Sequence, residues 1–226
     1  MLARQVFTAL LLAAASSGAV AADATIGGVS INLPTPAGFC DLKDQDPSDK
    51  RMITVLTDLI AKSGNKLLAM SADCRQLTAW RAQKRSVLDD LGQYQTSIAL
   101  VDKPLAEPVK QTCASLRAEG DKLLANQFPD IKARIESALE RVKINNTTFM
   151  GVLAEDPTAC YAALLQKIQT EAGTDKTQVI AFATTIVKNK SVFVYRIALY
   201  ANSASVDAVL AKLKVNFAAL LAANRN

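Results

Sequence analysis

The sequence predicts a single α+β domain with a mostly antiparallel sheet of about six strands, covered by helices and closed by a C-terminal amphipathic helix. Three observations predict this fold class. Apolar segments with alternating or continuous patterning recur along the chain and stop at proline, glycine or asparagine, as strands do. Segments with apolar residues at helical spacing lie between several of them. Half of the 226 residues are apolar, which is enough to bury one large core.

The first 21 residues have the features of a secretory signal peptide. Arg4 precedes an uncharged core rich in leucine and alanine, which ends at Ala19-Val20-Ala21. The apolar core is shorter than the span of about 20 residues that crosses a bilayer. We therefore expect cleavage near Ala21, with Ala22 as the near alternative, and a periplasmic or secreted protein with no transmembrane segment. Residues 22–226 are then one domain.

The first elements of this domain have clear boundaries. Residues 24–34 (ATIGGVSINLP) alternate apolar and small or polar side chains and indicate a first strand, which stops at Pro34. Asp46 and Pro47 form a helix start, with an N-cap followed by proline at the first helical position. One apolar stripe then continues to Gly64, the expected C-terminal glycine.

The middle of the chain alternates between the two kinds of pattern. The pattern predicts a strand at residues 66–73, a helical segment at 74–91, a strand at 93–101, and two helices within 105–145 on either side of Pro129.

The C-terminal part contains the strongest patterns. We expect a strand at residues 147–156, a helix opened by Asp156-Pro157 that ends at Gly173, a hairpin of strands 177–187 and 191–200, and a helix at 203–224. Both faces of the hairpin are apolar, so its strands are expected at the centre of the sheet. The last helix is amphipathic throughout and is expected to pack on the hairpin.

Several sequence segments resemble known proteins. The segments 31–40 (INLPTPAGFC), 65–81 (NKLLAMSADCRQLTAWR) and 152–167 (VLAEDPTACYAALLQK) resemble a group of uncharacterised exported alphaproteobacterial proteins. The order of elements, from an opening VSINLPTPAGF strand to a closing hairpin packed by a C-terminal helix, resembles the PsbP-like α/β/α sandwich. This resemblance implies a scaffold whose members mostly act as binding or assembly modules, and it brings no catalytic residues.

Histidine is absent from the chain, which excludes several reaction classes. A Ser-His-Asp or Cys-His relay and a His-ligated zinc site cannot be built within it. Any general acid or base would have to be Asp, Glu, Lys, Tyr or Cys. The acidic loop 41–50 fails the EF-hand pattern because Asp49 stands where glycine is required. We expect no cofactor, no metal and no catalytic residue that the sequence can identify.

The formal net charge of +5 is mild, and we expect no nucleic-acid binding. The densest basic run, Arg81, Lys84 and Arg85, lacks interleaved aromatic residues. We interpret it as a solvated helix face, with binding to an anionic surface as the alternative.

Cys40, Cys74, Cys113 and Cys160 are an even number of cysteines in a chain with an export signal, which favours disulfides. Their spacing includes no CxxC motif, and the four cysteines can pair into disulfides in three ways. Cys40 and Cys74 both follow predicted strands, whereas the other two lie near predicted helix starts. We therefore favour Cys40 with Cys74 and Cys113 with Cys160, each bond adding about 2 to 4 kcal/mol of stability.

Four residues are candidates for ligand contact. Arg196 is a charge within the apolar strand VFVYRIALY, next to Tyr195, and Trp80 stands near Arg75. Trp80 has the alternative role of a core anchor.

The leading hypothesis is an exported, non-catalytic binding or assembly protein, stabilised by disulfides, whose partner is an unidentified protein or small molecule of the cell envelope. A first alternative is a periplasmic enzyme that uses carboxylate, Tyr, Lys or Arg groups on cell-envelope or sugar substrates. Convergence of Arg196, Tyr195 and an acidic residue in one cleft would favour that alternative. A second is envelope association through the helix around residues 206–221.

Overall fold

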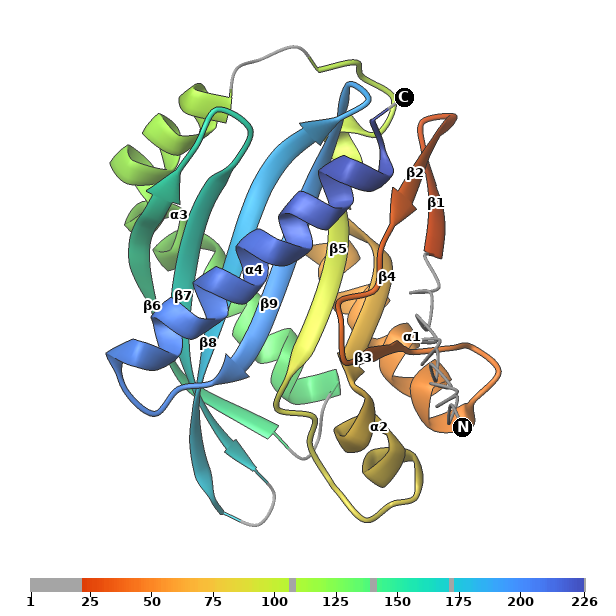
Figure 1. Ribbon diagram of the computed structural model, residues 1–226. Coiled ribbons are helices and arrows are strands. Elements are labelled where there is room, and N and C mark those ends of the chain that lie inside the picture. Colours follow the sequence, from red (N-terminus) through yellow and green to blue (C-terminus); the bar gives the residue numbers. More distant parts are fainter. Residues whose placement is uncertain (1–21, 106–108, 139–141, 171–172, 226) are drawn as a thin grey trace, which may run out of the picture.

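The computed structural model describes residues 22–105, 109–138, 142–170 and 173–225, and Figure 1 shows their arrangement. They form one α+β domain with four α-helices, a seven-stranded antiparallel sheet and a separate two-stranded hairpin. The fold class predicted from the sequence is therefore confirmed, with more strands than expected. The predicted signal peptide, residues 1–21, and its cleavage site lie outside the described residues.

The elements follow one another in a regular order. They are β1 (Ala22–Ile26), β2 (Val29–Leu33), β3 (Phe39–Asp41), α1 (Pro47–Lys62), β4 (Asn65–Asp73), α2 (Cys74–Arg81), β5 (Leu91–Ser97), a 3-10 turn (Ile98–Leu100), α3 (Val109–Ala138), β6 (Val142–Glu155), β7 (Cys160–Thr170), β8 (Asp175–Val187), β9 (Lys190–Leu199) and α4 (Ser203–Ala223). The large sheet has the order β3-β4-β5-β9-β8-β7-β6, so the predicted hairpin β8–β9 is central.

Helices cover both faces of this sheet. Helix α4 and the β1–β2 hairpin lie on the front face in Figure 1, whereas α1 and α3 lie on the opposite face. The inner side of α4 is apolar and joins the main core through Val206, Val209, Leu213, Phe217 and Leu220. The predicted C-terminal amphipathic helix and its packing on the β8–β9 hairpin are thus confirmed.

A second, smaller core lies between α1, α2 and the β3–β4 edge of the sheet. Its buried members are Leu42, Met70, Ala72, Leu77 and Leu88, and the partly buried Met52, Ile53, Leu56 and Trp80 pack against them. The aromatic ring of Trp80 therefore acts as a core anchor for the short helix α2. This is the structural role that the sequence left open for it.

The start of α1 follows the predicted capping pattern. The side chain of Asp46 accepts hydrogen bonds from the backbone N–H groups of Ser48 and Asp49, and Pro47 is the first helical residue. Gly64 follows the helix with a φ of 84°, a conformation that glycine adopts without strain.

The prediction of a helix after Asp156 is wrong, because residues 160–170 form strand β7. The carboxylate of Asp156 accepts hydrogen bonds from the backbone N–H groups of Thr158 and Ala159, each at 2.8 Å. The backbone N–H of Asp156 donates to the carbonyl of Ala159, which closes a tight turn into β7. An aspartate before proline caps such a turn as well as a helix, so this local pattern does not distinguish the two.

Three other predictions need correction. The helical segment predicted at 74–91 ends at Arg81, since Gln83 takes a positive φ of 56° and the chain leaves the helix there. Among the described residues of the region 105–145, one long helix, α3, continues through Pro129 instead of breaking. The first predicted strand is a hairpin, β1–β2, that turns at Gly27-Gly28.

Candidate functional site

The candidate residues Arg196 and Tyr195 do not converge on one site. Successive side chains of a strand point to opposite faces of a sheet, and these two are neighbours in β9. The guanidinium of Arg196 lies beside Asp90 and over the ring of Phe39. The ring of Tyr195 instead packs against Phe182, with the ring centres 5.6 Å apart. Burial raises the pKa of Tyr195 to about 12, so its hydroxyl stays protonated.

The side chain of Arg196 reaches from β9 to the edge strand β3, and small residues make this path possible. The strand register places Arg196 opposite Gly92 of β5, and Gly92 opposite Ser71 of β4. A Cβ atom at Gly92 would lie 2.9 Å from the Ser71 hydroxyl and 4.0 Å from the ring of Phe39. Glycine at this position therefore leaves room for the arginine and the phenylalanine to meet.

The charge of Arg196 is offset within the fold. Its Nη2 atom is 3.1 Å from Oδ1 of Asp90, and its Cζ atom is 3.7 Å from the ring centre of Phe39. The side chain of Arg196 is 4% exposed and that of Asp90 is 21% exposed. Within the described part of the chain, no group forms a well-aligned hydrogen bond with the Arg196 Nε atom or the Asp90 Oδ1 atom.

Burial dominates the electrostatics of this pair. It raises the pKa of Asp90, while the positive charges of Arg196 and Lys212 act in the opposite direction. Burial likewise lowers the pKa of the Arg196 guanidinium, against the stabilising charge of Asp90. The pair is therefore a buried structural link between β9, β3 and the loop that carries Asp90.

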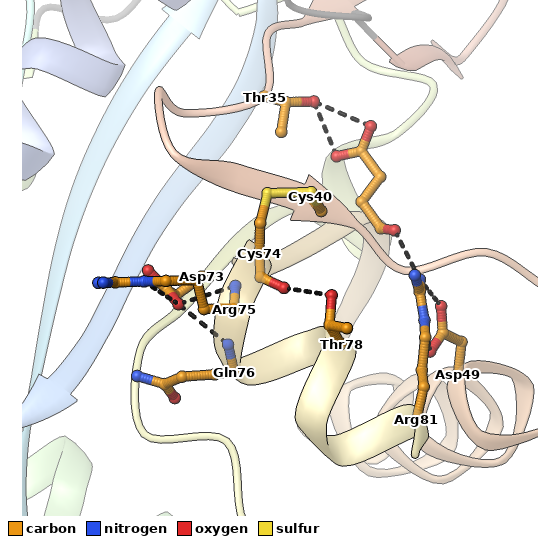
Figure 2. The surroundings of a disulfide bond; sticks show 10 residues. Thr35, Cys40, Asp49, Asp73, Cys74, Arg75, Gln76, Thr78 and Arg81 are labelled. Carbon is orange, nitrogen blue, oxygen red and sulfur yellow. Dashed lines mark hydrogen bonds and ion pairs between the residues drawn. A yellow bond between two sulfur atoms is a disulfide. The ribbon is translucent and has the colours of Figure 1, made fainter.

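The candidate Arg75 lies on α2, which is fixed to the sheet at its first turn. The side chain of Asp73 accepts hydrogen bonds from the backbone N–H groups of Arg75 and Gln76, at 3.1 and 3.0 Å. Figure 2 shows these contacts beside a disulfide between Cys74, the first residue of α2, and Cys40 of β3. The start of this helix is thus held both by a cap and by a covalent bond.

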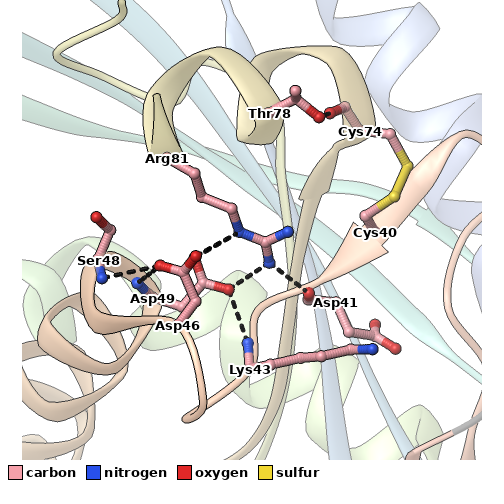
Figure 3. Close-up of polar contacts among 9 residues, drawn as sticks. All are labelled: Cys40, Asp41, Lys43, Asp46, Ser48, Asp49, Cys74, Thr78 and Arg81. Atoms are coloured by element: carbon pink, nitrogen blue, oxygen red, sulfur yellow. Dashed lines mark hydrogen bonds and ion pairs between the residues drawn. A yellow bond between two sulfur atoms is a disulfide. The ribbon is translucent and has the colours of Figure 1, made fainter. Parts of the chain in front are cut away.

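The other end of α2 is held by Arg81, a contact that the sequence interpretation missed. Asp49 is completely buried, and its carboxylate accepts hydrogen bonds from the Arg81 guanidinium and from the backbone N–H of Lys43. Arg81 also donates to the backbone carbonyl of Asp41 at 3.2 Å, as Figure 3 shows. The hydrogen bond with Asp49 raises the pKa of Arg81.

The basic run is therefore not a uniformly solvated helix face. Arg81 is paired with Asp49, and Arg85 forms an ion pair with the nearly buried Asp89, which also contacts Lys176 at 2.8 Å. A buried carboxylate needs such partners. The helical spacing of Asp49 with Met52, Ile53 and Leu56 places it on the apolar stripe of α1 and could have marked it as inward-facing. Only Lys84 of the run is exposed.

What remains accessible on α2 is a shallow open depression. It is lined by Cys74, Arg75, Thr78, Ala79, Ala82 and Lys84. The side chain of Arg75 is 95% exposed, with a long contact of 3.9 Å to Asp73. The lining of the depression thus combines two cationic side chains, Arg75 and Lys84, with small side chains.

The second disulfide joins Cys113 of α3 to Cys160 of β7. The two bonds together are the pairing favoured from the sequence, and among the described residues no cysteine is left free. Each bond fastens a helix to the large sheet. Within the described ranges, no three acidic or cysteine side chains gather in the way that would hold a metal ion. The helices described also contain no stretch long and apolar enough to cross a membrane.

Comparisons with known proteins give only distant structural likenesses. No family model matches the chain, and no curated protein matches it. Among solved structures, the chain is similar to the Ran-binding protein Mog1p of Saccharomyces cerevisiae, at 12% identity and a TM-score of 0.31, over 91% of this chain and 92% of that one. A point mutant of Mog1 has the same identity and TM-score, with 93% of its chain covered. Likenesses at this level carry no conclusion about the function of this chain.

Proposed function

We propose that this protein is an exported, disulfide-stabilised and non-catalytic binding or assembly protein that works in an oxidising compartment such as the bacterial periplasm. The observation that carries the proposal is the pair of disulfides, which fasten α2 and α3 to the sheet across sequence separations of 34 and 47 residues. Disulfides of this kind persist in exported proteins and are rare where thiols are kept reduced.

The engagement of the acidic side chains supports a binding role over a catalytic one. Asp49, Asp89 and Asp90 each have a cationic partner within the fold. Asp156 is occupied by hydrogen bonds from its own turn. A general acid or base must be positioned to face a substrate, whereas each of these four carboxylates faces a partner within the fold.

We place the binding surface on the depression of α2 and propose an acidic segment of a partner protein as its occupant. Arg75 and Lys84 supply positive charge to its lining. The small side chains of Thr78, Ala79 and Ala82 between them let a partner backbone approach closely. Because the cap, the disulfide and the Arg81–Asp49 pair already fix α2, little ordering free energy is spent when a partner binds.

The two alternatives receive less support. An enzyme that relies on Arg196 and Tyr195 together would need both on one face, and they lie on opposite faces. Envelope association through α4 would need its apolar side, which is already buried in the core. The proposed resemblance to the PsbP-like sandwich is one of layer order alone, with helices on both faces of the sheet. The proposed resemblance to exported alphaproteobacterial proteins depends on the sequence segments 31–40, 65–81 and 152–167.

Fluorescence of Trp80, the only tryptophan of the chain, offers a direct binding assay because it lies on the same helix. A synthetic glutamate-rich peptide should change this fluorescence at low ionic strength. The double variant Arg75→Glu, Lys84→Glu should weaken binding by about tenfold or more, through the reversal of two charges.

The matched control is Lys143→Glu, an exposed position on β6 at the far edge of the sheet. This variant should bind the peptide as the original chain does. Equal loss in both variants would contradict a site on α2. Binding to vesicles of anionic phospholipid, with no binding of the peptide, would contradict the protein partner and indicate a membrane surface as the occupant.

A further inference from the structure

The two disulfides differ sharply in their access to solvent. Cys113 and Cys160 are both 0% exposed, enclosed between α3 and the sheet. Cys40 and Cys74 are only partly buried, and Cys74 lines the depression of α2. Thiol–disulfide exchange requires a thiolate to approach a sulfur atom directly, so access decides which bond reacts.

We propose that Cys40–Cys74 is a thiol-exchange site, which an external dithiol opens in the folded protein while Cys113–Cys160 stays closed. The dithiol is either a small molecule or the paired cysteines of a thiol–disulfide oxidoreductase. This inference is independent of the acidic partner proposed above, because it depends on the sulfur atoms and not on what else occupies the depression.

The exchange proceeds in two balanced steps. One thiolate of the dithiol attacks the sulfur of Cys74 from the depression, the Cys40–Cys74 bond breaks, and the sulfur of Cys40 leaves as a thiolate and takes up a proton. The second thiolate of the dithiol then attacks the dithiol sulfur that is bonded to Cys74. The sulfur of Cys74 leaves and takes up a proton, so that Cys74 becomes a thiol. The dithiol loses two electrons and two protons, and the protein disulfide gains them.

The charges around the depression favour an anionic attacker. Arg75 adjoins Cys74 in sequence, and Lys84 lines the same depression. The carboxylate of Asp73 opposes them, but it is engaged by the backbone N–H groups of the first turn of α2. The exposed Arg75 therefore adds an accessible positive charge to the surface that an approaching thiolate meets.

Opening this bond leaves α2 attached to β3 by other contacts. The backbone N–H of Cys74 donates to the carbonyl of Gly38 at 3.1 Å, and Arg81 still donates to the carbonyl of Asp41. The second core beneath Leu77 and Trp80 is also unchanged. The reduced protein therefore keeps its fold, with β3 and α2 loosened locally. Of these contacts, Figure 2 shows the hydrogen bond donated by Arg81.

A graded reduction of the folded, oxidised protein tests this proposal. Increasing dithiothreitol is followed by alkylation of free thiols and mass mapping of the labelled peptides, with circular dichroism to monitor folding. We expect label on Cys40 and Cys74 at dithiol concentrations that leave Cys113 and Cys160 unlabelled and the spectrum unchanged. Label on all four cysteines together, label on the buried pair first, or no label short of unfolding would each overturn it.

Reduced thioredoxin distinguishes the source of the dithiol. Faster opening by thioredoxin than by dithiothreitol at equal thiol concentration supports a protein partner, and opening by dithiothreitol alone supports a small molecule.

Charge variants test the role of the cationic residues. Arg75→Gln and Lys84→Gln should each slow the opening of Cys40–Cys74 by about threefold at low ionic strength, and added salt should remove the difference. Lys143→Gln, on the opposite edge of the sheet, should open at the original rate. Equal rates in all variants would remove the electrostatic part of the proposal.

Discussion

The guanidinium of Arg196 lies over the ring of Phe39, with its Cζ atom 3.7 Å from the ring centre. The two residues belong to β9 and β3, and two strands stand between them in the sheet. This contact joins the short edge strand β3 to the centre of the sheet on the front face, while the Cys40–Cys74 disulfide joins the same strand to α2. The edge of the sheet is therefore fastened from two sides.

Removal of the charge of Asp90 should destabilise the protein. Asp90→Asn leaves Arg196 buried without its counter-charge, at a cost of about 2 to 3 kcal/mol in the free energy of unfolding. This cost is below the range of about 3 to 5 kcal/mol for a fully buried pair, because the side chain of Asp90 is 21% exposed. Urea denaturation of Asp90→Asn, Arg196→Met and the double variant gives the coupling free energy between Asp90 and Arg196.

The double variant should be more stable than Asp90→Asn alone, because it buries no unpaired charge. Additive effects of the two substitutions would mean that Arg196 and Asp90 do not depend on each other.

The two glycines of the β1–β2 turn should differ in their tolerance of alanine. Both have positive φ, 50° for Gly27 and 78° for Gly28. A Cβ atom at Gly27 would lie 2.1 Å from the backbone oxygen of Val101, whereas nothing lies within 4 Å of one at Gly28. Gly28→Ala should cost about 1 kcal/mol from backbone strain alone.

Gly27→Ala should cost about 1 to 3 kcal/mol more than Gly28→Ala, since the clashing atom is backbone and cannot rotate away. Thermal unfolding of the two variants side by side measures the difference. Equal stability would mean that the hairpin does not rest against Val101.

The contribution of Asp156 to stability should depend on pH. Burial alone would raise the pKa of this carboxyl, but hydrogen bonds from Thr158, Tyr161 and Ala159 outweigh it and hold the pKa below the ordinary value. A lowered folded-state pKa stabilises the protein above the unfolded-state pKa of about 3.9, and this stabilisation is lost as pH falls through the folded-state value.

At neutral pH Asp156→Asn should therefore lower the free energy of unfolding by about 1 kcal/mol, mainly through the lost bond from the Tyr161 hydroxyl. The difference from the original chain should shrink below about pH 3. The control Asp58→Asn removes an exposed carboxylate from a different element, α1, and should leave the free energy of unfolding at neutral pH unchanged. A constant difference across pH would contradict the lowered pKa.

Patterns that span a whole element predicted the fold well. The stripe of α4 and the doubly apolar strands β8 and β9 are long, and packing them against one another buries both in the main core. Local signals were less reliable. Asp46-Pro47 opens a helix and Asp156-Pro157 closes a turn, although the two dipeptides are identical. The residues that follow each dipeptide decide between helix and turn. Residues 160–170 pair with neighbouring strands of the sheet, whereas residues 47–62 do not.

The candidate site was predictable only in part. Strand alternation alone separates Tyr195 from Arg196, so their divergence follows from the sequence once β9 is recognised. The partner of Arg196 could not be inferred in that way. Asp89 and Asp90 are adjacent, yet one contacts Lys176 and the other Arg196, whose side chains lie on opposite faces of the sheet. Such pairing depends on tertiary structure.

Export and oxidation of the chain can be measured together, as the intact mass of the protein recovered from the periplasm of a bacterial host. We expect a mature chain that begins at or next to Ala22, two hydrogens lighter for each of the bonds Cys40–Cys74 and Cys113–Cys160, and unreactive toward thiol alkylation until it is reduced. A chain that keeps residues 1–21, stays inside the cell and has four alkylatable cysteines would contradict it.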